Sequence, residues 1–384
     1  MSVQIIQVFL STHSPEILIG TLAYKNRQLY FEYDKDFIAT GIELSPYKLP
    51  LKPGLHQCND NVFFGLFGVF ADSMPDGWGR LLLDRYLAAQ GINQADISPL
   101  DRLGYIGAYG IGALTYKPIR KGLESEVQPI NLDALAQKSI HILNDDTQQD
   151  LKQLLTLGGS SAGARPKILA QIDQNNNIIS GTQALQDGYE HYIIKFPSSL
   201  DPENIGQQEY QYSLMAQSAG VQMPPTKLLQ GKYFATKRFD RILNKRVHIH
   251  SVAGLVHSDF RYPSLDYDDL LSLTLHMTKD TKEQAKMFKL AVFNLFAHNR
   301  DDHAKNFSFL LDGNNQWKLS PAYDLTYSQG PGAEHSTTYL GEGKNPTEAH
   351  LIKLAKKHNI NNAKIIIAQI RDIVKINGCT PNYP

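Results

Sequence analysis

The sequence predicts an α+β protein of two lobes, with a small α+β subdomain in front and a mainly helical lobe at the end. Up to about residue 120, short apolar runs alternate with one helical segment. More short apolar runs follow a Gly- and Ser-rich stretch, and beyond Leu265 the apolar spacing is chiefly helical. We therefore expect an N-terminal subdomain at 1–120, a linker and helix at 121–155, a first lobe at 156–250 and a helical lobe at 251–384.

The elements can be placed from the period of the apolar residues. The N-terminal part and the linker region contain strands at Ile5–Leu10, Gln28–Tyr33 and Leu114–Tyr116, a helix at Gly79–Gln90, a polar linker from Lys117 to about Val127, and helical sequence from Asn131 to Leu155. Strands Ile168–Ile172 and Tyr233–Thr236 and the helix Gln207–Ala219 are expected in the first lobe. The last lobe should hold helices Tyr267–His276, Thr281–His298, Thr347–His358 and Asn361–Ile376.

The composition is that of an ordinary globular chain. The 384 residues are 42% hydrophobic, which suffices for a sizeable core. Lys plus Arg equals Asp plus Glu at 38 each, so no global positive field draws the chain to nucleic acid, and any role on DNA should be indirect.

The expected compartment is the cytoplasm. Residues 1–16 lack the features of a secretory signal, and no apolar run approaches the ~20 residues that span a bilayer, so no membrane contact is expected. Cys58 and Cys379 are too few for a disulfide framework or a zinc site, and we expect both to be reduced.

The most informative run is Asn299–Asn306, between a predicted helix and a predicted strand at Phe307–Leu311. Asp301 precedes Asn306 by five residues. In phosphoryl transfer a carboxylate orients the attacking hydroxyl and takes its proton, while a nearby amide oxygen helps hold the metal on the phosphates. The spacing predicts these two roles for Asp301 and Asn306.

Other polar residues of this run are candidates as well. Asp302 could exchange roles with Asp301, and only the spacing to Asn306 favours Asp301. His303 and Lys305 complete the catalytic candidates. The alternative is a plain polar loop with a helix cap, a common use of such residues.

A carboxylate that binds only the metal should follow the strand pair that turns at Asn314–Asn315. Asp324 stands there, at the end of Leu319–Asp324. We therefore predict that Asp324 joins Asn306 as a ligand of Mg²⁺, for which oxygen donors are suited.

The Gly- and Ser-rich segment Leu157–Lys167 is a candidate phosphate loop. Small residues let backbone N–H groups approach phosphate oxygens, and hydroxyls add donors. The segment is neither a Walker A motif nor G-x-G-x-x-G, so a flexible connection is the alternative. The candidate ATP-binding residues are Ser160, Ser161, Ala162, Gly163, Ala164 and Lys167.

Two more residues fit a nucleotide site. Lys195 interrupts the short apolar strand His191–Pro197, where its charge would be matched by the phosphates of ATP or, alternatively, by water at the strand edge. Glu209, on the helix Gln207–Ala219, could pair with Lys195, help hold Mg²⁺ or face solvent. A phosphate loop, a strand lysine, a helix glutamate, an Asp-to-Asn loop and a metal aspartate follow in the order in which kinases build their cleft. This order predicts a kinase that uses ATP and Mg²⁺, with residues 156–250 as its nucleotide-binding lobe.

The chain resembles the HipA family of serine/threonine kinases, the toxins of bacterial toxin–antitoxin pairs. The resemblance covers most of the chain and rests on several specific motifs. These are Met74–Arg80, Leu103–Gly107, Gly110–Leu114, Ser160–Lys167, Ile194–Lys195, Lys237–Arg241, Asp301–Asn306 and Ser320–Asp324. It implies a two-lobed kinase-like fold, with Asp301 catalytic, Asn306 and Asp324 on magnesium, and Lys195 on the nucleotide phosphates.

The resemblance also implies regulation and partners. In the family a serine of the Gly/Ser loop is autophosphorylated, which falls on Ser160 or on its neighbour Ser161. A phosphoserine would compete with the phosphates of ATP for the same N–H groups and switch the kinase off. The implied substrate is a serine of a translation component such as an aminoacyl-tRNA synthetase, and the implied partner is a small DNA-binding antitoxin like HipB, through which alone the chain would meet DNA.

Two other functional interpretations stay open. The Asp-x-His-x-x-Asn form of the loop is also similar to that of phosphoinositide kinases, which would make the chain a small-molecule or lipid kinase, although no basic or amphipathic surface segment is evident. The chain could instead be a non-catalytic co-repressor that acts through its partner. Retention of Lys195, Asp301, Asn306 and Asp324 together argues against that.

Two further motifs have structural interpretations. Asp240 of Lys237–Arg241 is expected to form an ion pair with an arginine. His248 and His250 have the alternate spacing of a metal site, but alternate strand residues share a face with or without a metal. We expect both to be structural.

Overall fold

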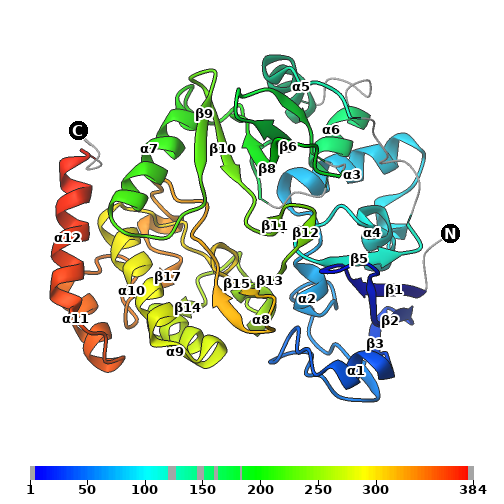
Figure 1. Ribbon diagram of the computed structural model, residues 1–384, viewed down its shortest axis with the longest axis horizontal. Coiled ribbons are helices and arrows are strands. Elements are labelled where there is room, and N and C mark those ends of the chain that lie inside the picture. The colour runs from blue at the N-terminus through cyan, green and yellow to red at the C-terminus, as the bar shows by residue number, and fades with distance from the viewer. Residues whose placement is uncertain (1–4, 120–126, 145–150, 160–162, 182–183, 379–384) are drawn as a thin grey trace. The chain divides into compact units, whose positions relative to one another are not determined.

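The computed structural model describes residues 5–119, 127–144, 151–159, 163–181 and 184–378 (Figure 1). The chain forms two compact units. The first joins Met1–Gln207 with Thr226–His250, and the second joins Gln208–Pro225 with Ser251–Pro384. The N-terminal subdomain and the nucleotide-binding lobe expected from the sequence therefore pack together as one unit.

The first unit opens with an antiparallel five-stranded sheet of order β4-β3-β2-β1-β5. Its strands are β1 (Ile5–Leu10), β2 (Ile17–Lys25), β3 (Gln28–Tyr33), β4 (Leu55–Gln57) and β5 (Leu114–Lys117). Buried and more exposed residues alternate along β1 and β3, because successive strand residues point to opposite faces. The helices of this part are α1 (Lys35–Thr40), α2 (Gly68–Ala71), α3 (Gly77–Ala89) and α4 (Pro99–Ile106), with a 3₁₀ turn η1 at Gln94–Asp96.

Local sequence explains where α4 begins. Ser98 accepts a hydrogen bond from the N–H of Asp101, and the Asp101 carboxylate accepts from the N–H of Ser98. This reciprocal pair satisfies two backbone N–H donors at the helix end. Pro99 at the first helical position has no backbone N–H, so it leaves no donor without an acceptor. The helix ends at Gly107, which has a positive φ of 51°.

A second antiparallel sheet has the order β7-β6-β8-β10-β9. It consists of β6 (Lys167–Asp173), β7 (Ile178–Ser180), β8 (Tyr189–Lys195), β9 (Thr226–Leu229) and β10 (Tyr233–Lys237), and the short pair β11 (Arg241–Ile242) and β12 (Lys245–Arg246) follows it. Ile168 and Ile194 share one apolar cluster with Leu82 of α3 and Leu154 of α6 (Leu151–Gly158). The helices thus cover the face of the sheet that carries Ile168 and Ile194.

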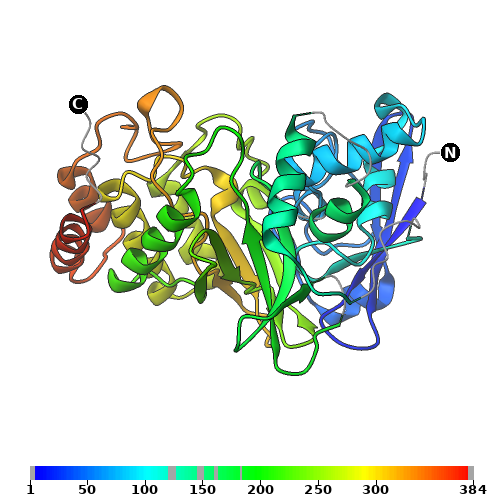
Figure 2. The ribbon, with the colours of Figure 1, turned by 90° about the horizontal axis from the view of Figure 1, so that it is seen from above.

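The second unit is mainly helical. Its elements are most of α7 (Ile205–Ser218), α8 (Val252–Val256), α9 (Tyr267–Thr278), α10 (Thr281–Phe296), α11 (Glu348–Lys357) and α12 (Ala363–Ile376), with a 3₁₀ turn η2 (Ala304–Asn306), another, η3 (Pro331–Ala333), and short strands β14 (Leu265–Asp266), β15 (Ser308–Leu311), β16 (Trp317–Leu319) and β17 (Thr337–Thr338). Strand β13 (His248–Ser251) lies where the chain passes from one unit to the other. The buried helix α10 packs against α9 and α12 (Figure 2).

Two expected connections fall partly outside the described residues. The helical sequence from Asn131 to Leu155 forms α5 (Leu132–Leu143) and α6, with residues 145–150 outside the described part of the chain. The expected linker falls largely on residues 120–126, which also lie outside it. Within the described residues, no helix is long and apolar enough to cross a membrane.

Candidate functional site

The Asp301-to-Asn306 segment joins the end of α10 to β15, as expected for a helix-to-strand loop. Helix α10 begins at the cap Asp280, which accepts from the N–H of Lys282. At its end the N–H of Ala297 donates a hydrogen bond to the carbonyl of Phe293. His298 then turns the chain with a φ of 51°. The loop therefore leaves a buried helix in a defined direction.

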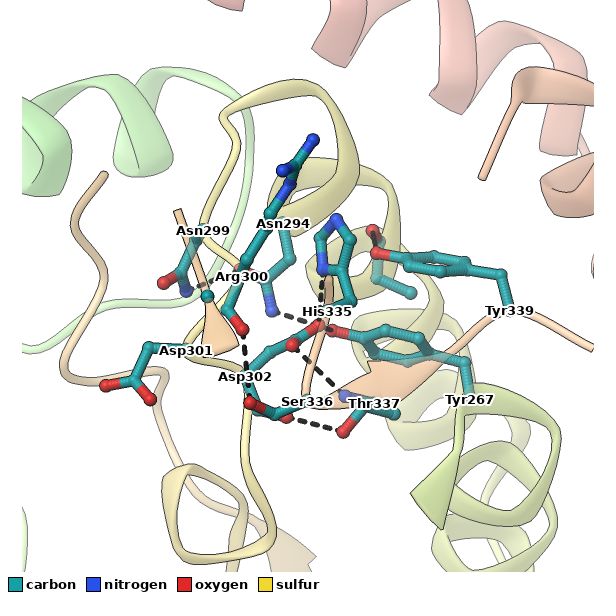
Figure 3. A network of polar contacts seen from close by, with 12 residues as sticks. Tyr267, Asn294, Asn299, Arg300, Asp301, Asp302, His335, Ser336, Thr337 and Tyr339 are labelled. Atoms are coloured by element: carbon teal, nitrogen blue, oxygen red, sulfur yellow. Dashed lines mark hydrogen bonds and ion pairs between the residues drawn. The ribbon is translucent and has the colours of Figure 1, made fainter. Parts of the chain in front are cut away.

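Asp302 is the buried anchor of this loop (Figure 3). Its Oδ2 accepts hydrogen bonds from the Tyr267 hydroxyl at 2.8 Å and from Nδ1 of His335 at 2.9 Å. Its Oδ1 accepts from the N–H of Thr337 at 3.2 Å, and its backbone carbonyl accepts from the Thr337 hydroxyl at 2.5 Å. The residue is only 1% exposed, so its carboxylate contacts neighbouring protein groups and little solvent.

The network continues into the core of the second unit. The Asn294 amide donates to the Tyr267 hydroxyl at 2.8 Å and accepts from the Asn299 amide at 3.0 Å. Burial, with the charge of Asp302 as a further cause, raises the pKa of Tyr267 well above its usual range. The hydroxyl therefore stays protonated and keeps donating to Asp302.

Asp301 has the opposite environment. Its side chain is 58% exposed and points away from the Asp302 network in Figure 3. Nδ2 of Asn306 donates to the backbone carbonyl of Asp301 at 2.7 Å, which ties together the two ends of the loop from Asp301 to Asn306. Nε2 of His303 lies 4.0 Å from Oδ1 of Asp301. The loop thus presents the Asp301 carboxylate to solvent while its backbone is held.

The surroundings of Asp302 differ from those of the other catalytic candidates. Its carboxylate is buried and accepts three hydrogen bonds, which favours a role in positioning the loop, whereas the carboxylate of Asp301 is exposed. His303 and Lys305 both border Phe260, with ring centroids 5.7 Å apart for His303 and Nζ of Lys305 4.3 Å above the Phe260 ring.

Asp324 follows the β15–β16 hairpin and is held beside the loop by its neighbour. The Tyr323 hydroxyl donates to the carbonyl of Lys305 at 2.6 Å and lies 2.5 Å from the hydroxyl of Ser308. Asp324 itself is exposed and has a left-handed φ of 57°. The bond from Asn306 to Asp301 uses the amide nitrogen, so the Asn306 oxygen and the Asp324 carboxylate are oxygen donors of the kind Mg²⁺ takes. These residues fit the cation that the sequence predicts.

Two lysines stand side by side in the first unit. Lys167 of β6 and Lys195 of β8 are directly opposed Cα partners, so their side chains share a face. It is the face opposite that of Ile168 and Ile194, because neighbouring residues alternate. A Cβ built on Gly163 would lie 2.3 Å from Nζ of Lys167, and Nζ of Lys195 lies 5.7 Å from the centre of the Phe234 ring. Two facing cations beside a glycine backbone fit an anionic group such as a phosphate.

The remaining predicted site residues are Glu209, three residues outside the described part of the chain, and Ala164. Glu209 is buried in α7 and belongs to the second unit, whereas Lys195 belongs to the first, so their pairing stays a prediction. Ser160, Ser161 and Ala162 lie outside the described residues. Ala164 directly follows Gly163 and contributes to the close packing at Gly77.

The Lys237–Arg241 motif has the structural role expected of it. Asp240 is buried and bonded to Arg238 at 2.7 and 2.9 Å and to Arg241 at 2.7 Å. Its Oδ2 also accepts from the N–H of Gly112 at 2.8 Å, and Arg241 donates to the carbonyls of Gly110 and Gly112. The ion pair therefore clamps the glycine-rich turn of the N-terminal subdomain.

The two histidines of β13 are also structural. His250 bonds to Asp72 at 2.6 Å and to the hydroxyl of Ser45 at 3.0 Å, and His248 bonds to the carbonyl of Leu44 at 3.1 Å. All three contacts reach segments of the first unit more than 170 residues away. The expectation that these histidines serve the fold is confirmed.

Sequence reasoning missed the hydrogen-bond network around Asp302, in which Asn294 donates to Tyr267 and both His335 and Thr337 donate to Asp302. Asn294 is a polar residue amid the apolar positions of α10, and that is the one signal the sequence offers. His335 and Thr337 give no such signal in the sequence, because they lie 33 and 35 residues away from Asp302 along the chain.

Comparisons with known proteins agree with the motifs. A model of the HipA-like C-terminal domain matches residues 159–376, and a model of the HipA N-terminal domain matches residues 10–117. The serine/threonine-protein kinase toxin HipA of Shewanella oneidensis is 24% identical over 355 residues, which are 82% of this chain and 74% of that protein.

Two other likenesses add to this. The protein Y4dM of Sinorhizobium fredii is 30% identical over 154 residues, 35% of this chain, and the match spans only 36% of the length of that relative. The solved complex of HipA, HipB and operator DNA from Shewanella oneidensis contains a chain of the same fold, with a TM-score of 0.68 at 19% identity over 98% of this chain and 92% of that one. This likeness confirms the two-lobed α+β, kinase-like HipA fold predicted from the sequence.

Proposed function

The chain belongs to the HipA family, and from that premise we propose that it is an ATP-dependent serine/threonine kinase acting as the toxin of a toxin–antitoxin pair. One observation supports this most directly. Of two adjacent carboxylates, Asp302 is buried and hydrogen-bonded, and Asp301 is exposed on a loop whose backbone is held by hydrogen bonds. A phosphoryl-transfer base needs such an accessible carboxylate in a fixed position.

In the proposed reaction Asp301 accepts the proton of a serine hydroxyl. The serine oxygen forms a bond to the γ-phosphorus of ATP as the bond from that phosphorus to the bridging oxygen of ADP breaks. Asn306 and Asp324 would hold Mg²⁺, which when bound offsets the negative charge of the phosphates. Lys167 and Lys195 would contact phosphate oxygens, with Gly163 and Ala164 supplying backbone close to them and Glu209 completing the nucleotide site.

The proposed substrate is a serine of a translation component, with an aminoacyl-tRNA synthetase as the first candidate, which follows from the family resemblance. The proposed partner is a small HipB-like DNA-binding antitoxin. The solved Shewanella complex supports the pairing, since it contains HipA, HipB and operator DNA. The net charge of zero fits a chain that reaches DNA through its partner.

Autophosphorylation of Ser160 or Ser161 is part of the same proposal. A phosphoserine carries close to two negative charges and competes for the donors that bind ATP phosphates. The modified protein should therefore bind ATP more weakly than the unmodified one.

Intact-mass spectrometry tests the proposal. Wild-type and Asp301→Asn protein are dephosphorylated and incubated with Mg-ATP, and peptides are then mapped. We expect one added phosphate in the wild type alone, on Ser160 or Ser161. A wild-type protein that binds ATP but gains no phosphate and transfers none to serine peptides would overturn the proposal and favour the small-molecule kinase or the co-repressor.

A further inference from the structure

The turn Asp76–Gly77–Trp78 touches the predicted phosphate loop directly. The Asp76 carboxylate accepts the backbone N–H of Gly163, and the backbone N–H of Trp78 donates to the carbonyl of Gly163 at 2.9 Å. Both backbone polar groups of Gly163 are thus taken by one turn of the N-terminal subdomain. The contacts lie within the first compact unit.

The glycine at the centre of this turn permits the approach. Gly77 has a positive φ of 43°, and a Cβ there would lie 2.5 Å from the carbonyl oxygen of Gly163 and 2.7 Å from Cα of Ala164. Any side chain at this position would push the two segments apart. The backbone contact therefore depends on a residue with no side chain.

Trp78 also reaches the other end of the same loop. A Cβ on Gly158 would lie 3.2 Å from Nε1 of Trp78, whose side chain is 1% exposed. Gly158 and Gly163 both belong to the Gly- and Ser-rich segment Leu157–Lys167, so one buried tryptophan contacts this segment at two points. The turn fixes where the loop leaves α6 and where it enters β6.

The held backbone borders the facing lysines. Gly163 is in contact with Nζ of Lys167, which is opposed to Lys195 across β6 and β8. The carbonyl of Pro166 also accepts the N–H of Phe196 at 2.8 Å, so the exit from the loop is tied to the end of β8. A shift of Gly163 would therefore change the surroundings of the Lys167 ammonium.

We propose that the Asp76–Gly77–Trp78 turn is a positioning element of the nucleotide site and that Asp76 is its positioning residue. Asp76 acts through the Gly163 backbone and touches neither ATP nor substrate. The inference rests on the proposed function for the identity of the ligand, and it makes the N-terminal subdomain a required part of nucleotide binding.

The test compares full-length wild type with Asp76→Ala, Asp76→Asn and Gly77→Ala, and uses Asp96→Ala as a control because Asp96 is an exposed carboxylate of the same subdomain. Amide hydrogen exchange at Gly163 is measured without nucleotide, and the Kd and KM for Mg-ATP and kcat are measured separately. We expect at least tenfold faster exchange and at least tenfold weaker ATP binding in Asp76→Ala and Gly77→Ala, with kcat changed less than about threefold.

The conservative variant separates positioning from a general folding defect. Asp76→Asn keeps an acceptor oxygen for the Gly163 N–H and should recover most of the ATP affinity, and Asp96→Ala should equal the wild type. Asp76→Ala with wild-type exchange at Gly163 and wild-type ATP affinity would overturn the positioning role alone. A wild type that binds no Mg-ATP would overturn the proposed function and, with it, the nucleotide role of the turn.

Discussion

The Tyr267 hydroxyl donates a hydrogen bond to Oδ2 of Asp302 at 2.8 Å, and both side chains are buried. The same hydroxyl accepts from the Asn294 amide, so it links helices α9 and α10 to the loop that presents Asp301. A buried polar group that loses its partner is costly, whereas a satisfied one defines a single arrangement.

Tyr267→Phe should therefore destabilise the second unit. The change leaves the Asn294 amide without its acceptor and removes one donor from Asp302, at an expected loss of about 1–3 kcal/mol. Urea denaturation of both proteins measures it. Tyr262→Phe, at a tyrosine that is 69% exposed, serves as the control and should change stability by less than about 0.5 kcal/mol. Equal stabilities for Tyr267→Phe and wild type would contradict the network.

The two adjacent carboxylates should respond differently to substitution. Asp301→Asn should keep the wild-type stability, because the side chain is exposed, and lower phosphoryl transfer about 100-fold or more. Asp302→Ala leaves three buried donors unmatched and should cost at least about 3 kcal/mol. Transfer assays combined with thermal melts separate the two effects. Stable Asp302→Ala protein with unstable Asp301→Asn protein would reverse our assignment.

Asn306→Ala should weaken the use of magnesium. The variant loses a proposed oxygen ligand and the bond to the Asp301 carbonyl. We expect the Mg²⁺ concentration for half-maximal rate to rise at least about tenfold. A magnesium titration at saturating ATP measures this, with Asn314→Ala on the β15–β16 turn as the matched control. An unchanged magnesium dependence would remove Asn306 from the cation site.

Stability of the first unit should fall in mild acid. Burial, followed by the charges of Arg238 and Arg241, lowers the pKa of His191 to about 4, and burial, followed by His250, lowers that of His248 to about 4. In the unfolded chain a histidine takes its proton near pH 6.5, so protonation favours unfolding as the pH falls from about 6.5 toward 4.

His248 should cost about 2 kcal/mol between pH 7.5 and pH 5, and the less completely buried His191 should cost less. Denaturation curves at the two pH values measure the loss of stability. The His248→Gln protein has no histidine to protonate at this position, so it should lose about 2 kcal/mol less than the wild type between the two pH values. A His248→Gln protein with the wild-type pH dependence would contradict the buried neutral state of His248.

Replacing the buried carboxylate of Asp240 should strongly lower the free energy of unfolding. Burial alone raises its pKa, but the charges and hydrogen bonds of Arg238 and Arg241 outweigh this and hold the pKa well below its usual range. Asp240→Asn should cost about 3–5 kcal/mol, because it leaves two buried arginines without their counter-charge. Asp259→Asn, which breaks an exposed pair with Arg261, should cost less than about 1 kcal/mol. Comparable losses for the two variants in urea denaturation would contradict the assignment.

Much of the fold could be predicted because it depends on local periodicity. The strands Ile5–Leu10 and Gln28–Tyr33 have the bounds expected from the sequence, and the helices beginning at Tyr267 and Thr281 begin where expected. Short elements such as β4 and β9 were not foreseen, since three or four residues carry too little pattern to reveal a strand.

The sequence by itself determined the residue types of the candidate site and their order along the chain, from the Gly/Ser loop through Lys195 to Asp301, Asn306 and Asp324. The tertiary structure decided which of two neighbouring aspartates is presented to solvent, because Tyr267, His335 and Thr337 surround Asp302 from distant segments. It also brought Asp76 to Gly163 across 87 residues. Spacing along a chain encodes local geometry, whereas burial and hydrogen-bond partners arise only when distant segments pack together.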